Sequence, residues 1–375
     1  MPSTCVREKI VRKARTLVIK VGTNVLADEK GRLDDRLITS LAGQVWKLKE
    51  AGKNVVVVSS GAIGAGVGML ELPGRPKELS VLQAAAAVGQ GKLMQLFEKA
   101  LWKRKLHAGQ VLITRSDFED RRRYINIERT LEALNRLGAI PIINENDTVA
   151  VDEIRFGDND LIATLVANMA RADLLVVLTV VDGLLDRKGQ RVDFVPCVGD
   201  ETLGLLRAEK STLGTGGMRS KLQSVKMATS AGIDTIIACG KTKDVLPRMI
   251  LKGEKLGTVF AGSCHRVSGK RSWIALAAKT MGSIIVDDGA ARAVISGGKS
   301  LLPSGIIGVQ GVFKPGDVVS VVNGSGQILA RGLTNYHTQQ LLKIKGRRSD
   351  WIRKMIDEHC AEEAIHRDNM IVTHG

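Results

Sequence analysis

The sequence predicts an α/β protein in which a mostly parallel β-sheet is sandwiched between helices, followed by a small β-barrel-like domain. The chain has 375 residues, enough for two domains or for one large domain with an addition. Its first three-quarters alternate short, β-branched apolar runs with longer segments of helical periodicity, as in sheets that helices cover on both faces. Near residue 282 this alternation gives way to short strands separated by glycine-rich turns.

The first region is expected to supply the parallel sheet. Short apolar runs predict strands at Leu17–Val21, Val55–Val58, Val111–Thr114, Ala139–Ile143, Leu174–Thr179 and Thr235–Ala238. Apolar residues at helical spacing predict helices at Leu33–Glu50, Leu79–Lys103, Tyr124–Leu137 and Leu222–Ala231. Because strands and helices alternate, consecutive strands are expected to run parallel.

The second region has a different pattern. Frequent turn signals delimit short strands at Ser283–Val286, Ala293–Ile295, Gly305–Val309, Val318–Val322 and Ile328–Ala330. A helix is expected at Asp350–Ile365, followed by a polar end. The change falls near Thr280–Ser283, which predicts a first domain at 1–281 and a second, with a helical tail, at 282–375.

Composition excludes several classes of protein. Hydrophobic residues make up 44% and charged residues 25%, a globular rather than a disordered balance, and 3% aromatic residues argue against a large base-stacking surface. No apolar stretch approaches the ~18 residues of a membrane span, and the basic N-terminus has no apolar region typical of a signal peptide. Five scattered cysteines without a CxxC pair are typical of free thiols in a reducing compartment. We therefore expect a soluble, cytoplasmic protein.

The net charge is unusual. There are 55 basic and 39 acidic residues, which gives +16. Such a charge suits either a nucleic-acid partner or phosphate-bearing substrates. The basic residues are mostly dispersed, which favours solubility and steering of anions over a dedicated nucleic-acid face.

Ligands of open parallel sheets bind beyond the carboxyl ends of the strands, and four such ends carry unusual residues. Lys20 ends the first strand beside Gly22, where its ammonium could meet a phosphate or could simply lie on the surface. The glycine-rich segment 59–66 follows the next strand. Its amides could bind an anion, although a purely structural turn explains the glycines equally well.

The third strand end is the most specific. Asn144-Glu145-Asn146-Asp147 follows a buried strand, and Gly157-Asp158-Asn159-Asp160 lies shortly after it. Carboxylates together with amides suit a zwitterion, since carboxylates bind an ammonium and amides bind a carboxylate. A magnesium site and a solvated loop are the alternatives.

The fourth is a flexible segment, 215–221, with two adjacent glycines and a lysine at the start of a helix. It fits either an anion clamp or a mobile loop before a capped helix.

Together these segments resemble the glutamate 5-kinase family of the amino acid kinase superfamily. VIKVGTNVL, VVVVSSGAIGAG, PIINENDTV, FGDNDLIATLVA and GTGGMRSK occur in the family's order over roughly residues 15–275. LLPSGIIGVQGVFKPGDVVSVVNGSGQILARGL then resembles the PUA module, a small barrel. The resemblance implies the three-layer amino acid kinase sandwich followed by a PUA domain.

The resemblance also implies site residues. Lys20 and Lys221 match the family's two catalytic lysines, with no metal ligand assigned. The positions matching glutamate contacts, or lining the same pocket, are Ser60, Asn144, Asp147, Asn159 and Asp160. Those matching ATP contacts are Lys20, Thr179, Thr215, Gly216, Gly217, Met218, Arg219, Ser220 and Lys221.

One position departs from the family pattern. Val180 follows Thr179 where the family commonly has an aspartate, although Asp182 comes soon after. A nucleotide contact made by that aspartate is therefore in question.

The implied reaction is phosphorylation of L-glutamate by ATP with Mg²⁺, giving L-glutamyl 5-phosphate on the way to proline. The attacking carboxylate has an ordinary pKa of ~4.3 and needs no general base, in keeping with six dispersed histidines. A homo-oligomer (dimer or tetramer) and feedback inhibition by proline follow from the resemblance.

Two alternatives stay open. Another member of the superfamily could phosphorylate a different carboxylate, carbamate or a nucleoside monophosphate. The PUA-like domain could instead bind RNA, through a basic run comprising Lys343, Lys345, Arg347, Arg348, Arg353 and Lys354.

Overall fold

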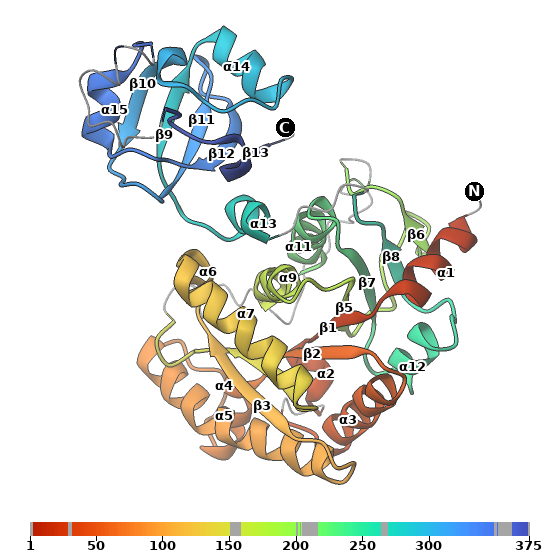
Figure 1. Cartoon of the computed structure of the whole chain (residues 1–375). Coiled ribbons are helices and arrows are strands. Elements are labelled where there is room, and N and C mark those ends of the chain that lie inside the picture. The colour runs from red at the N-terminus through yellow and green to blue at the C-terminus, as the bar shows by residue number, and fades with distance from the viewer. Residues whose placement is uncertain are drawn as a thin grey trace. The chain divides into compact units, whose positions relative to one another are not determined.

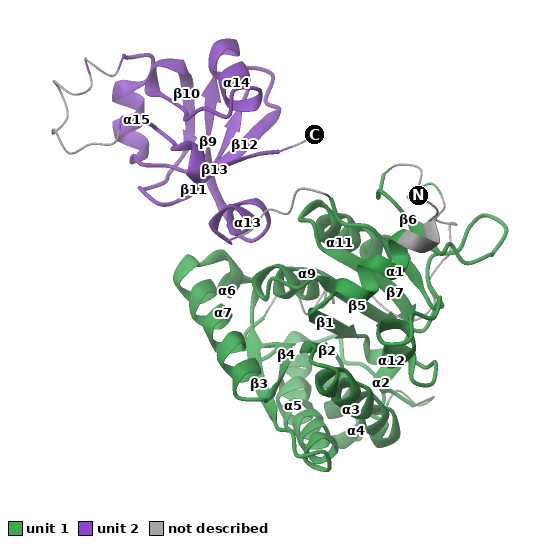
Figure 2. Cartoon of the chain, turned by 45° about the vertical axis from the view of Figure 1, so that its right-hand side comes forward, with its two compact units in different colours: residues 1–266 green, residues 267–375 purple. Residues whose placement is uncertain are grey.

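The chain folds into two compact units, residues 1–266 and 267–375, shown in green and purple in Figure 2. The computed structural model describes residues 3–28, 32–150, 159–199, 202, 204, 217–263, 269–348, 351 and 362–373. The change of sequence pattern predicted a boundary near 280–283. The structural division comes earlier, because α13 (Gly269–Leu276) belongs to the second unit, where Arg271 Nε donates to the Met370 carbonyl at 3.1 Å.

The first unit is built on one sheet with the strand order β3-β4-β2-β1-β5-β7-β8-β6 (Figure 1). From β3 to β7 every neighbouring pair is parallel, and only β8 runs antiparallel to its neighbour β7. The mostly parallel sheet predicted from the sequence is thus confirmed. The strands are β1 (Thr16–Val21), β2 (Asn54–Ser59), β3 (Ala108–Ile113), β4 (Ile140–Glu145), β5 (Leu174–Thr179), β6 (Phe194–Val195), β7 (Asp234–Cys239) and β8 (Thr258–Phe260).

Helices cover both faces of this sheet. None of the helices in the described ranges combines the length and apolar character needed to cross a membrane. The helices are α1 (Ser3–Lys13), α2 (Thr23–Leu26), α3 (Asp35–Glu50), α4 (Ala62–Met69), α5 (Leu79–Trp102), α6 (Arg115–Glu119), α7 (Arg121–Arg136), α9 (Asn159–Met169), α11 (Met218–Ser230) and α12 (Val245–Ile250).

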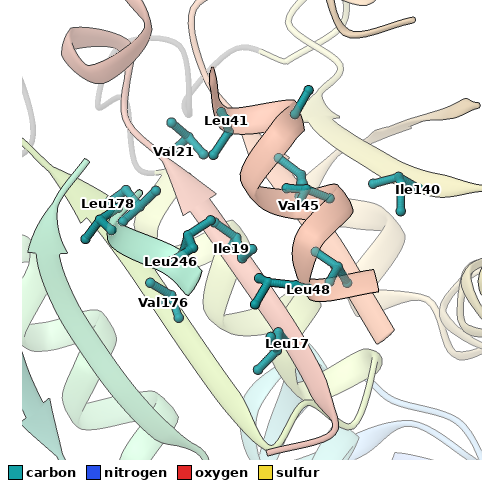
Figure 3. Close-up of a cluster of buried hydrophobic side chains, with 14 of the residues drawn as sticks. Leu17, Ile19, Val21, Leu41, Val45, Leu48, Ile140, Val176, Leu178 and Leu246 are labelled. Atoms are coloured by element: carbon teal, nitrogen blue, oxygen red, sulfur yellow. The ribbon is translucent and has the colours of Figure 1, made fainter. Parts of the chain in front are cut away.

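Successive side chains of β1 point alternately toward the apolar core and toward the candidate site. Leu17, Ile19 and Val21 pack on one face of the sheet against α3, with Leu41 and Val45 among their neighbours (Figure 3). Successive side chains of a strand point to opposite faces, so Lys20 projects from the other face, the one that α9 covers. The same strand therefore anchors the core and presents a charged group.

The second unit has its own five-stranded sheet, in the order β10-β9-β11-β12-β13, and its own apolar core. Its strands are β9 (Thr280–Val286), β10 (Ile306–Gly311), β11 (Val318–Val322), β12 (Ile328–Leu333) and β13 (Met370–Val372). Among the described residues of this unit, the helices that follow α13 are α14 (Asp288–Ile295), α15 (Thr338–Ile344) and the 3₁₀ turns Pro303–Gly305 and Arg367–Asn369.

The structure corrects two expectations in this unit. The predicted strand Ala293–Ile295 is wrong, because these residues end helix α14, which begins where the Asp287 carboxylate accepts from the Ala290 amide at 2.7 Å. The helix predicted at Asp350–Ile365 lies mostly outside the described residues. At its described end Ile365 forms a β-bridge with Leu301 and is not helical.

Candidate active site

Five neighbouring parallel strands, β4, β2, β1, β5 and β7, end at one edge of the sheet. Backbone hydrogen bonds join the segments that follow them: Ser60 donates to Val21 at 3.2 Å, and Gly22 donates to Leu178 at 3.2 Å. Segments far apart in the sequence are thereby fixed side by side at the edge where ligands of such sheets bind.

A buried cluster of three charges lies at this edge. Lys20 Nζ is 2.6 Å from Asp160 Oδ1, and Lys221 Nζ is 3.4 Å from Asp160 Oδ2. The three side chains are 5–11% exposed and come from β1, from the first turn of α9 and from the first turn of α11. One carboxylate therefore holds both lysines that the resemblance singled out.

The electrostatics of the cluster keep Asp160 ionised. Burial by itself would raise the pKa of this carboxyl, but the attraction of Lys20 and Lys221 and their hydrogen bonds lower it below its ordinary value. Two ammonium groups against one carboxylate leave an excess positive charge in a buried place. Such a cluster is suited to binding an anion.

Neutral polar side chains lie at the same edge of the sheet as the cluster. Asn159, directly before Asp160, donates from Nδ2 to Ser60 Oγ at 2.6 Å. On the next strand of the sheet, buried Asn144 donates from Nδ2 to Gln90 Oε1 of α5 at 2.8 Å. The structure thus brings Ser60, Asn144, Asn159 and Asp160 to one edge, as the positions of their strands and helix predicted.

Asp147 is partly buried in the turn after β4. Burial raises its pKa to about 6, and the Arg75 guanidinium offsets part of this effect. A carboxylate with a raised pKa gains from a cationic ligand, because an ammonium group would restore its charged form. Asp147 is therefore suited to contact a substrate amine.

The structure separates the roles of the glycines in segment 59–66. Gly61 has φ = +113° and caps α4, a conformation that favours glycine. A Cβ on Gly66 would lie 1.7 Å from the Ala85 carbonyl oxygen of α5. Gly66 therefore has a structural role rather than an anion-binding one, because it lets α4 and α5 approach closely.

The segments expected to contact ATP are described in part. Thr179 ends β5, and the Val180 and Val181 side chains after it are 48% and 38% exposed. Gly217 is the N-cap of α11, whose first turn contains Met218, Arg219, Ser220 and Lys221. Thr215 and Gly216, like Gly157 and Asp158, lie outside the described residues.

The described residues offer little for a protein-bound metal ion. No three His, Cys, Asp or Glu side chains among them are grouped as metal ligands, and Asp160 is already paired with two lysines. Of the cysteines whose side chains are described, Cys197 and Cys239 are free thiols.

Two features of the site were not predicted. The sequence indicated Asp160 as part of a substrate pocket, but not as the bridge between Lys20 and Lys221. It gave no indication of Gln90, which lies in the middle of a helix. The one available signal was the pair of glutamines at 83 and 90, which a helix places on the same side.

A lysine–carboxylate cluster at the carboxyl edge of a mostly parallel, helix-covered sheet defines the class of protein. The sequence profile of the amino acid kinase family matches residues 15–239, and that of the PUA domain matches residues 282–356. The chain thus has the amino acid kinase fold, followed by a PUA domain.

Full-length relatives narrow the assignment. The chain is 43% identical over 362 residues to the glutamate 5-kinase of Caldanaerobacter subterraneus subsp. tengcongensis, covering 95% of this chain and 97% of that protein. It is 45% identical over 370 residues to the glutamate 5-kinase of Moorella thermoacetica, covering 96% and 97%. It belongs to the glutamate 5-kinase family.

Proposed function

We propose that the protein transfers a phosphoryl group from ATP to the side-chain carboxylate of L-glutamate, forming L-glutamyl 5-phosphate and ADP in the first step of proline biosynthesis. The observation that carries this proposal is the Lys20–Asp160–Lys221 cluster at the same sheet edge as the polar side chains that follow β2, begin α9 and lie on β4. The names of the full-length relatives support glutamate as the acceptor.

The polar side of the site suits the acceptor. Asp147 would pair with the α-ammonium group of glutamate, and its raised pKa supports this role because it makes an ammonium partner favourable. Ser60 and Asn159, which hydrogen-bond to each other, come from the segments next to Lys20 and Asp160. They would direct the reacting carboxylate toward the cluster.

The charged side of the site suits the transfer. The glutamate carboxylate is ionised near neutrality, so its oxygen attacks phosphorus without a general base. One oxygen–phosphorus bond forms, the bond from phosphorus to the departing ADP oxygen breaks, and no proton moves. The obstacle is repulsion between two anions, and catalysis of phosphoryl transfer consists mainly of positioning and charge neutralisation.

Lys20 and Lys221 supply that neutralisation. At an effective dielectric constant near 20, an ammonium ~4 Å from a phosphate oxygen contributes roughly 4 kcal/mol before desolvation is counted. Asp160 fixes both ammonium groups before substrate arrives, so little reorganisation is needed when charge develops. Thr179 and the start of α11 would hold the rest of the nucleotide.

Mg²⁺ enters this proposal as part of the nucleotide substrate. The ion keeps several waters and is usually held by substrate phosphates together with one or two carboxylates rather than by a dedicated protein cage. Such binding agrees with the lack of a grouped set of metal ligands among the described side chains.

Further proposals rest on family membership. They are a dimeric or tetrameric assembly, feedback inhibition by proline and a cytoplasmic location. We also place the boundary between the catalytic and PUA domains at 281/282, where the PUA profile begins, with α13 as a connecting helix that packs on the second unit.

The test is ADP release with ATP, Mg²⁺ and L-glutamate, alongside L-aspartate, carbamate and UMP, with acyl phosphate trapped as the hydroxamate. We expect ADP and hydroxamate with L-glutamate only. Turnover with a different acceptor would contradict the proposed substrate, but phosphoryl transfer from ATP would remain the reaction. No turnover with any of the four would contradict the proposal and make RNA binding by the PUA domain the next measurement.

A further inference from the structure

Gln90 of α5 contacts Asn144, one of the side chains at the carboxyl edge of the sheet, and has no role in the mechanism above. It accepts from Asn144 Nδ2 at 2.8 Å. The other half of each amide, Asn144 Oδ1 and Gln90 Nε2, is buried and has no hydrogen-bond partner within the described part of the chain. Asn144 as a whole is 1% exposed. A buried donor and a buried acceptor thus lie together without partners.

This pattern does not depend on how the two amides are oriented. If both are turned by 180°, the hydrogen bond runs from Gln90 to Asn144, and the pair again leaves one nitrogen and one oxygen unpaired. Native proteins pair nearly all buried polar atoms, so two unpaired atoms on touching side chains indicate a ligand that pairs with both. That ligand must offer a donor and an acceptor close together.

Gln90 is held firmly where it stands. A Cβ on Gly89 would lie 1.9 Å from the Ala62 carbonyl oxygen, so α5 packs against α4 at the residue next to Gln90. One side of α5 also holds the loop after β4, since Gln83 Nε2 donates to the Ala150 carbonyl at 3.1 Å. The loop held in this way contains Asp147. Helix α5 therefore positions both the amide pair and the neighbouring carboxylate.

We propose that Gln90 and Asn144 form an amide pair that binds the α-amino-acid end of the substrate. The amide oxygen accepts from the α-ammonium group, and the amide nitrogen donates to the α-carboxylate. This inference rests on the proposed function, and it adds Gln90 as a residue that selects an α-amino acid over a simple dicarboxylate.

The geometry of the sheet agrees with this placement. Asn144 lies on β4 and Lys20 on β1, with β2 between them. Neighbouring strands are about 4.8 Å apart, so the backbones of the two residues stand about 10 Å apart across the sheet. Ile143 is level with Val58 and Lys20, so Asn144, one residue later, projects from the opposite face, toward α5. The substrate would therefore lie across the carboxyl edge of the sheet, where both faces are within reach, with its α-amino-acid end at the amide pair and its reacting carboxylate toward the lysine cluster.

The test compares L-glutamate with L-isoglutamine, in which the α-carboxylate is a carboxamide and the reacting carboxylate is unchanged. In Gln90→Glu the acceptor for Asn144 Nδ2 is kept, while the free donor becomes an anionic oxygen. We expect the KM for L-glutamate to rise about ten- to hundredfold. The KM for L-isoglutamine should stay constant or fall, because its carboxamide can donate to the new carboxylate. The KM for ATP should not change.

A control and a second variant complete the experiment. Gln95→Glu introduces the same charge at an exposed position of the same helix, and it should behave as the unmodified protein. Gln90→Leu removes the amide without adding charge, and it should raise the KM for L-glutamate about tenfold with little effect on L-isoglutamine.

An equal rise in KM for both compounds in Gln90→Glu would mean that Gln90 only supports the fold, and unchanged KM values would mean that it does not contact substrate. Either result overturns the amide pair while leaving the proposed function. Absence of hydroxamate from L-glutamate with the unmodified protein would overturn both.

Discussion

The two sides of the site differ in how their polar groups are satisfied. On the α9 side of β1, Lys20, Asp160 and Lys221 pair with one another and form a complete electrostatic unit without any ligand. On the β4 side, the amide pair leaves two buried atoms without partners among the described residues, and burial raises the pKa of Asp147.

This difference matches two different tasks. A phosphoryl group in transfer needs fixed charges that do not move as the reaction proceeds, and mutual pairing fixes them. A small amino acid must be distinguished from similar molecules, and buried groups that only the correct ligand pairs with give strong discrimination. The comparison predicts that changes on the first side reduce stability and turnover, whereas changes on the second side alter substrate affinity.

Asp160→Asn should have the largest effect on stability. The substitution keeps the shape of the side chain but leaves two buried ammonium groups without their shared carboxylate. Removing one partner of a buried ion pair costs about 3–5 kcal/mol, so we expect the free energy of unfolding, measured with urea, to fall by that amount at pH 7.

The pH dependence of this loss checks its cause. The folded-state pKa of Asp160 is below its ordinary value, so its contribution is present above about pH 4 and is lost as the pH falls through the lower, folded-state pKa. The control is Asp244→Asn, because Lys47 and Asp244 form an exposed pair at a similar distance, 2.8 Å. Exposed pairs contribute about 0.2–1 kcal/mol. Equal losses in the two variants would contradict a buried, cooperative cluster.

The second largest effect is expected from Lys20→Met and Lys221→Met, which should each reduce turnover. Each removes an ammonium group that faces the transferred phosphoryl group, and loss of one preorganised charge contact lowers kcat about a hundred- to thousandfold. Lys226→Met, an exposed lysine on the same helix as Lys221, serves as the control. Steady-state ADP release gives kcat, and far-ultraviolet circular dichroism checks that the variants fold. Near-normal kcat in either variant would remove that lysine from the mechanism.

The sequence predicted the first unit well for a physical reason. Runs such as Val55–Val58 are β-branched and too short for a helix, so β-strand is their favoured conformation, and β2 contains this run. The prediction of a strand at 293–295 was wrong because a run of three apolar residues fits a strand and a helix equally well. The Asp287 cap, six residues earlier, was the signal that decided for a helix.

The site was predicted as far as the strands define it. Lys20 and Asn144 lie in strands, and Ser60 directly follows one, and the carboxyl ends of these strands share one edge, so their gathering at that edge follows from the parallel sheet. The pairing of Asp160 with two lysines depends on how α9 and α11 cross the sheet. The contact between Gln90 and Asn144 depends on how closely α5 approaches β4. Neither packing distance is encoded in a local pattern.

Asp147→Asn tests the substrate side, with a smaller and opposite effect on stability. The folded-state pKa of about 6 exceeds the ordinary value of 3.8, so the ionised carboxylate destabilises the unliganded fold. This destabilisation is absent below about pH 4, grows as the pH rises toward 6 and is complete above it. We expect Asp147→Asn to increase the free energy of unfolding at pH 7 by an amount of order 2 kcal/mol, with no difference at pH 4.

The same substitution should weaken substrate binding. At pH 7.5 the KM for L-glutamate should rise about tenfold, because the α-ammonium group loses its charged partner, while kcat changes little. In the unmodified protein this KM should rise as the pH falls below about 6 and Asp147 takes up a proton, whereas in Asp147→Asn that rise should be absent. Glu132→Gln, at an exposed carboxylate of α7, is the control. An Asp147→Asn variant that gained stability yet kept its KM would place the buried carboxylate outside the amino-acid pocket, and a variant that lost stability would show that Asp147 has a structural partner instead.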